Sequence, residues 1–169
     1  MHKPEPAAYQ QLYSRYIKLV DQQPVLETLE NLKTSTYNLF SNLTDEQANH
    51  AYGPGKWTVK EVAGHLIDCE RTFAYRAMAF SRGQQELPGF NENVYAELSN
   101  ANNRTIQNLA AELKTLREAN LYMLRAMTPE QIEMRGIANG MPQQVNTLVY
   151  IIAGHEVHHL NILKERYGI

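Results

Sequence analysis

Four of the six histidines in the chain stand where they could bind a transition metal. His155 and His159 are four residues apart, and in a helix this spacing puts both imidazoles on one face, about 5–6 Å apart at Cβ. Two imidazoles so placed suit one metal ion. His65 lies beside an apolar helical stripe earlier in the chain, and helix bundles build metal sites from side chains on facing helices. The pattern therefore favours a three-histidine metal site.

Two alternatives stay open on the residues alone. A single histidine on an apolar helix face is more often a hydrogen-bonded core residue than a ligand. His158, three residues after His155, competes with His159 as its partner. The apolar line through Ile152 and Ile162 includes His155 and His159, which favours His159.

The segment from His155 to His159 also matches the H-E-x-x-H helix of zinc proteases. The extended form of that motif needs glycine and histidine where this chain has Ile162 and Glu165. A glutamate ligand well downstream is also excluded, because only ten residues follow His159. The sequence therefore argues against a protease and points upstream, to His65, for a third ligand.

Three neutral imidazoles would leave the full +2 charge of the metal in place. Such a cation can polarise a carbonyl or lower the pKa of a bound water to about 7, and it can also bind and deprotonate a thiol. Nitrogen ligands suit Zn, Ni, Co, Cu or Fe(II) rather than Mg or Ca. The expected chemistry is therefore metal-assisted attack on a small molecule.

Other polar residues near the histidines are weaker candidates. Glu156 follows His155 directly and points about 100° away on the helix, so it is a neighbour of the ligands, a surface carboxylate or a base. Asp68, one turn after His65, could orient that imidazole, and Asn120 could reach into the pocket or bond a neighbouring backbone group. Cys69 is expected to be a buried structural thiol rather than a nucleophile.

The elements that must hold these residues are predicted to be helices. Apolar residues recur at helical spacing over 24–43, over 58–83, up to Met127 from a start between 94 and 104, and over 145–167. Capping-box sequences begin at Thr44, Thr58 and Thr128. Four amphipathic helices predict an all-α fold, an up-down four-helix bundle. We expect one domain over 1–169, with residues 1–23, including Tyr9, as an extension packed on the bundle.

Composition narrows the range of partners. The net charge is −2 and the pI about 6.3, which argues against a nucleic-acid surface. The single cysteine suits a reducing compartment, no signal peptide is recognisable, and no apolar run approaches the ~20 residues of a membrane span. We expect a cytoplasmic protein that binds neither nucleic acid nor membrane.

Two motifs give the chain a family resemblance. The segment 56–68 resembles the W-[ST]-x-x-E-x-x-x-H-L-x-D motif of the DinB-like superfamily, and 70–76 continues the match. The segment 153–159 is similar to the A-G-H-E-x-H-H helix of the same family. Loops at 87–90 and 137–140 match one branch of it, and the resemblance covers about 24–167.

The resemblance implies a four-helix bundle with His65, His155 and His159 as metal ligands. It also implies zinc or nickel as the metal and a homodimer. Family members have been described as metal-dependent hydrolases, and some relatives transfer low-molecular-weight thiols. The expected substrate is therefore a small molecule, with the loop 88–93 over the mouth of the site. The alternative is a non-catalytic bundle whose metal stabilises the fold or a dimer.

Overall fold

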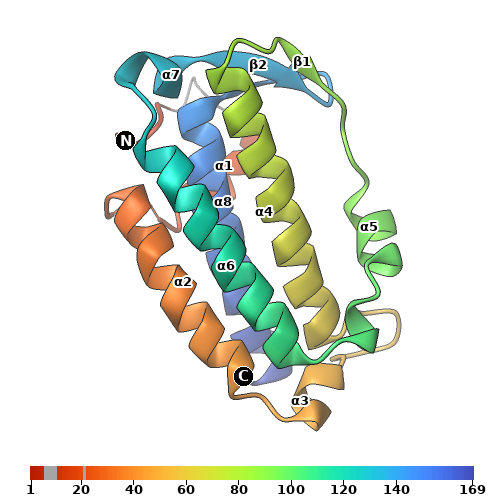
Figure 1. Ribbon diagram of the computed structural model, residues 1–169. Helices are drawn as coiled ribbons and strands as arrows, with labels where there is room; N and C mark the ends of the chain where they lie inside the picture. Colours follow the sequence, from red (N-terminus) through yellow and green to blue (C-terminus); the bar gives the residue numbers. More distant parts are fainter. Residues whose placement is uncertain (6–10, 21) are drawn as a thin grey trace.

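Four long helices form the body of the protein in a computed structural model that describes residues 1–5, 11–20 and 22–169 (Figure 1). They are α2 (Val25–Ser41), α4 (Val59–Ser81), α6 (Ile106–Arg125) and α8 (Val145–Ile162), and a π-helical turn, η3 (Leu163–Tyr167), extends α8. All four fall within the segments of helical periodicity, so the predicted all-α four-helix bundle is confirmed. Tyr9 lies outside the described residues.

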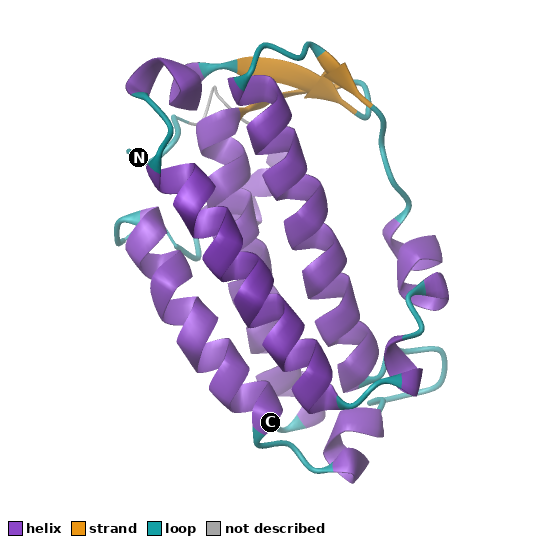
Figure 2. Cartoon of the chain, viewed as in Figure 1, coloured by secondary structure: helices purple, strands orange, loops and turns teal. Residues whose placement is uncertain are grey.

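Short elements connect and flank the bundle. They are α1 (Gln11–Ile17), α3 (Asp45–Asn49), α5 (Glu92–Leu98), α7 (Pro129–Glu133), the 3₁₀ turn η2 (Ala101–Asn103) and the strands β1 (Glu86–Leu87), β2 (Arg135–Ala138) and β3 (Met141–Gln144). Figure 2 shows the strands gathered at one end of the bundle.

Capping boxes start three of the helices, as predicted. The hydroxyls of Thr44, Thr58 and Thr128 each accept the backbone N–H three residues on, and the Gln or Glu side chain there accepts the N–H of the threonine. These bonds satisfy amide groups that the first turn of a helix leaves free. The box at Thr58 therefore sets the start of α4, two turns before His65.

The connection between α4 and α6 departs from simple up-down alternation. Three hydrogen bonds join the α4 segment to the α6 segment. They link Thr58 with Asn102, Glu70 with Arg117, and Arg71 with Glu112. The two residues of each pair are separated by a similar number of positions in the sequence, so α4 and α6 run parallel. The segment 82–105, which holds β1, α5 and η2, carries the chain back along the bundle (Figure 1). Amphipathic periodicity could not reveal this, because it reports which face is buried and not which way a neighbour runs.

The small sheet was not predicted. Strands β2 and β3 pair antiparallel around Asn139 and Gly140, both at positive φ, as a two-residue hairpin turn requires. Strand β1 pairs parallel with β2 through two residues. The sequence indicates loops around Leu87 and Asn139, where the structure has strands, because such short strands carry little periodicity of their own.

Helix α1 packs across α8, and Gly154 allows it to do so. A Cβ on Gly154 would lie 2.1 Å from the backbone oxygen of Tyr16, so only glycine permits this approach. The apolar side of α1 is buried there through Tyr13, Tyr16 and Ile17. Within the described residues, no helix is both long and apolar enough to cross a membrane.

Candidate metal centre

Three imidazoles converge between α4 and α8. The Nε2 atoms of His65 and His159 each lie 3.1 Å from Nε2 of His155. The rings of His65 and His159 are 4.8 Å apart between centroids. The two helices run antiparallel (Figure 1), and the four-residue spacing on α8 turns both of its histidines towards His65.

Burial keeps these imidazoles neutral. His65 and His155 are buried, and His159 is partly buried. Burial lowers the pKa of His65 to about 4 and, together with the nearby histidines and Arg15, that of His159 to about 3. The pKa of His155 falls well below its usual value for the same reasons. Near neutral pH the cluster therefore presents nitrogen lone pairs rather than positive charge.

Cys69 lies against the same cluster, one turn after His65 on α4. Its Sγ is 3.6 Å from both ring nitrogens of His65. Donor atoms of His65, Cys69 and His155 all lie within 4.8 Å of one another, so these three side chains could hold a metal ion. Burial raises the pKa of the thiol, so without a cation Cys69 stays protonated, as expected for a buried structural thiol.

The donor set fits a transition-metal cation. Nε2 of a neutral imidazole either donates or accepts one hydrogen bond, yet Nε2 of His155 has two ring nitrogens at 3.1 Å. Hydrogen bonding within the cluster therefore cannot satisfy all three imidazoles. A cation that accepts several lone pairs matches this arrangement, and nitrogen with sulfur selects Zn or its transition-metal neighbours over Mg or Ca.

Aromatic rings enclose the histidines. Trp57 lies 4.8 Å from His65 between ring centroids, Tyr16 lies 5.4 Å from His155, and Phe73 lies 6.3 Å from His155. These rings restrict water around the nitrogen cluster. His158 makes T-shaped ring contacts with Tyr16 and His159, and no hydrogen bond joins it to His155 among the described residues.

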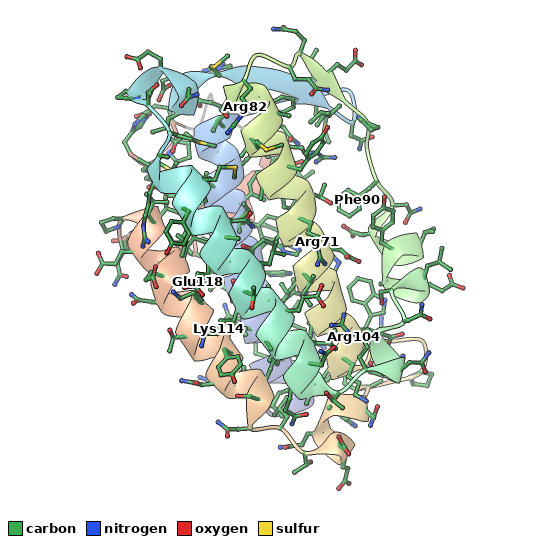
Figure 3. All side chains as sticks on the ribbon, in the orientation of Figure 1. Arg71, Arg82, Phe90, Arg104, Lys114 and Glu118 are labelled. Carbon is green, nitrogen blue, oxygen red and sulfur yellow. The ribbon has the colours of Figure 1, made fainter. Side chains whose placement is uncertain are left out.

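Cavities border the centre on two sides. One of about 260 Å³ is lined by His155 and Cys69 together with residues of α1, α4 and the loop before α5. The other, of about 250 Å³, lies on the His159 side and is lined by Trp57, Lys56 and Tyr167. Phe90, expected in a loop over the mouth, lines the first cavity, and Figure 3 shows it between β1 and α5. The first cavity therefore touches His155 and the second touches His159.

Glu156 is not a surface carboxylate. It is buried, its Oε2 accepts a bond of 2.6 Å from Nη2 of Arg117, and its Oε1 accepts one of 2.5 Å from the Thr36 hydroxyl. Arg117 also bonds both oxygens of Glu70, at 2.7 and 2.6 Å. Glu156 therefore serves a buried polar cluster and is occupied as an acceptor, which weakens it as a candidate base.

This cluster links all four long helices, with Thr36 on α2, Glu70 on α4, Arg117 on α6 and Glu156 on α8. We call it the polar clasp. Asn120 joins it by donating to Glu70 at 3.1 Å, so it neither reaches the histidines nor bonds a neighbouring backbone group.

Asp68 is not seen to orient His65. Its carboxylate lies 4.0 Å from a nitrogen of Arg71, and no hydrogen bond joins it to His65 in the described structure. Its pKa is raised by burial, which the positive charge of Arg71 only partly offsets. It lies instead on the surface where Arg71 and Arg104 both bond Glu112, and Figure 3 labels both arginines.

The sequence did not single out Arg117 as a buried partner of two carboxylates, and it did not place Cys69 beside the histidine cluster. Arg117 is four residues after Leu113 and four before Leu121, both buried, so its place on the apolar line was the available signal. Cys69 is four residues after His65, the same spacing that linked His155 to His159.

Comparison with known proteins gives the chain its family. The DinB superfamily profile matches residues 28–163. A Bacillus subtilis protein named "Putative metal-dependent hydrolase YfiT" is 23% identical over 150 residues, covering 85% of this chain and 84% of the relative. A Geobacillus kaustophilus protein of the same description, GK0616, is 28% identical over 149 residues, covering 81% and 79%.

A solved structure supports the same assignment at the level of the fold. The structure of Bacillus subtilis YfiT, described as a probable metal-dependent hydrolase with an unusual four-helix bundle topology, superposes with a TM-score of 0.69. It covers 99% of this chain and 94% of that one at 21% identity. With most of its length matched by the family profile, the chain belongs to the DinB superfamily.

Proposed function

We propose that the protein is a metal-dependent enzyme that acts on a small molecule, with His65, His155 and His159 as ligands of one divalent transition metal. The observation that carries this proposal is the convergence of their Nε2 atoms, with two contacts of 3.1 Å, beside a cavity of about 260 Å³. Zinc and nickel are the metals we expect, from the neutral nitrogen ligands and the family.

The chain's own residues would hold the cation and shape the space beside it. Neutral imidazoles leave the cation its full charge, and such a cation polarises a carbonyl and lowers the pKa of a water molecule to about 7. Trp57, Tyr16 and Phe73 pack around the imidazoles and limit solvent there. Glu156, the residue after His155, is bonded by Arg117 and Thr36 in the polar clasp. These bonds fix the turn of α8 that carries His155.

The names of the relatives favour hydrolysis as the reaction. Transfer of a low-molecular-weight thiol is the alternative for the same centre, since a divalent cation also binds and deprotonates thiols. A substrate screen should therefore pair ester and amide hydrolysis with thiol conjugation.

Metal content by elemental mass spectrometry tests the ligand set. Protein without a histidine tag should hold close to one transition-metal ion per chain, and alanine in place of His65, His155 or His159 should abolish it. His158→Ala is the matched control and should retain the metal. No metal after incubation with zinc or nickel, or equal loss in His158→Ala, would contradict the assignment.

A second function is favoured by Cys69. Its Sγ lies 3.6 Å from the His65 ring nitrogens, so it could supply a fourth ligand and close the site, as in structural zinc centres. Cobalt(II) substitution separates the two, because a thiolate ligand adds a near-ultraviolet charge-transfer band that Cys69→Ser removes. The enzyme proposal expects no such band, and a strong one would make the site structural.

A further inference from the structure

The cavity beside His155 has an unusual balance of polar groups. Its lining residues include Arg15, Arg76, Tyr13 and Tyr16, whose side chains carry hydrogen-bond donors, and one carboxylate residue, Glu92. The donors lie on α1 and α4, which border the histidine cluster. A wall rich in hydrogen-bond donors suits a ligand that carries hydrogen-bond acceptors.

Arg76 is a buried cation without a carboxylate partner. It is 4% exposed, and among the described residues it forms no ion pair. Its Nη2 donates to the backbone oxygen of Pro88 at 3.1 Å, and its guanidinium lies 5.7 Å from the Phe73 ring and 5.8 Å from the Phe90 ring. Buried arginines are normally paired, because an uncompensated charge away from water is costly.

The remaining donors of Arg76 are available to a ligand. A guanidinium carries five N–H groups, and the Pro88 oxygen uses one of them. The buried polar atoms without a partner are Gln143 Oε1 and Asn146 Oδ1 in the described structure, so the other Arg76 nitrogens are not sealed in protein. They are open to the cavity that Arg76 lines.

The two tyrosines add further donors. The Tyr13 hydroxyl accepts a bond of 2.9 Å from Gln143 Nε2, and the Tyr16 hydroxyl accepts one of 2.6 Å from Arg15 Nη2. Since each oxygen is already used as an acceptor, each O–H hydrogen is free to donate.

The charges of the wall favour an anionic ligand. Arg15 and Arg76 outnumber the one carboxylate residue, Glu92, and a divalent metal at His155 would add to the positive side. The rings of Phe73 and Phe90 offer an apolar surface next to the guanidinium. A volume of about 260 Å³ limits the ligand to a small molecule.

We propose that this cavity binds a small carboxylic acid, whose carboxylate is held by Arg76 and the tyrosine hydroxyls while its apolar part lies against Phe73 and Phe90. The proposal deepens the proposed function, on which it rests, by naming a substrate class: a carboxylate-bearing molecule whose other end lies at His155. If Arg76 served only to hold the loop at Pro88, a neutral ligand of the same shape would bind equally well.

Phenylacetate and phenylacetamide provide the test, since they share a shape and differ in charge. Each is titrated into the zinc-incubated full-length protein by isothermal calorimetry. We expect the acid to bind at least about tenfold more tightly, because hydrogen bonds to a charged group are stronger than neutral ones. Arg76→Gln should remove this preference, and Arg76→Lys should retain part of it.

Arg82→Gln is the matched control. Arg82, labelled in Figure 3, is an exposed arginine just after α4, and its side chain donates to the Met78 oxygen and the Ser81 hydroxyl. It should leave the acid-to-amide ratio unchanged. Equal binding of acid and amide, or an unchanged ratio in a folded Arg76→Gln variant, would overturn the proposal. If that variant does not fold, the comparison on the unaltered protein decides.

Two further measurements separate this inference from others. Inorganic phosphate that binds about tenfold more tightly than phenylacetate would replace the carboxylate by a phosphate group and overturn the assignment. Zinc content is measured on the same samples. Zinc bound without an acid preference refutes the carboxylate site alone, whereas an Arg76-dependent preference without zinc supports that site and refutes the metal-dependent function.

Discussion

Replacement of Arg117 by methionine is the sharpest test of what holds the bundle together around the site. Arg117 is 2% exposed and lies between two carboxylates that are themselves buried. It makes two bonds to Glu70, one to Glu156 and one of 3.2 Å to the Leu29 oxygen. Methionine fills much of the volume and removes every one of these donors.

The expected loss of stability comes from the two carboxylates that remain buried once Arg117 is replaced. Removing one partner of a buried ion pair costs about 3–5 kcal/mol, because the other charge is left uncompensated. Here two carboxylates lose their counter-ion, and among the described residues only Asn120 and Thr36 still donate to them. We therefore expect the upper end, about 5 kcal/mol, a large part of the roughly 5–15 kcal/mol that stabilises a domain.

Urea unfolding followed by circular dichroism measures this change. Arg125→Met is the matched control on the same helix, because Arg125 pairs with Glu30 at 2.6 Å across to α2 but is half exposed. Exposed pairs contribute about 0–1 kcal/mol, so the control should change little. Adding Glu70→Gln and Glu156→Gln to Arg117→Met should restore much of the loss, since the uncompensated charges are gone. A loss below about 1 kcal/mol for Arg117→Met would refute the clasp as a buried charge cluster.

Three more predictions follow from local features. Gly154→Ala should displace α1, because its Cβ would lie 2.1 Å from the Tyr16 oxygen, and amide hydrogen exchange should then speed up selectively in α1; unchanged protection there would contradict the close packing. Thr58→Ala should cost about 1 kcal/mol in urea unfolding by removing the cap of α4, and a neutral result would mean that the capping box does not stabilise the helix. Burial lowers the pKa of His65 to about 4, and burial with neighbouring charges lowers that of His159 to about 3, while an unfolded histidine titrates near 6.5. Below about pH 6.5 the unfolded chain therefore binds protons that the folded one does not, so the metal-free protein should lose stability between about pH 6.5 and 4, by ~1.4 kcal/mol per pH unit for each histidine. Urea midpoints that stay level across this window would show that these imidazoles are not buried in solution.

The helices and their starts could be predicted from the sequence, because both depend on residues close together in the chain. Helical periodicity located α2, α4, α6 and α8, and the box at Thr58 marked the first turn of α4 correctly. The shared face of His155 and His159 follows from the same local geometry. A candidate metal site on α8 was therefore visible before any fold was known.

What the sequence could not supply is the pairing between segments distant in the chain. The parallel course of α4 and α6 depends on how the 82–105 segment crosses the bundle, and the parallel pairing of β1 with β2 depends on the same crossing. A periodic stripe marks a buried face without naming the element that covers it.

The surroundings of the candidate site were decided at this tertiary level as well. Arg117 reads as one more charged residue in the sequence, and only the meeting of four helices shows that it lies between Glu70 and Glu156. Arg76 likewise becomes a candidate binding residue only because α1, α4 and the loop before α5 form one cavity beside it. Residue type and spacing determined which groups could do chemistry, whereas burial and partners, which come from elements far apart in sequence, decided their charge environment and their access to a ligand.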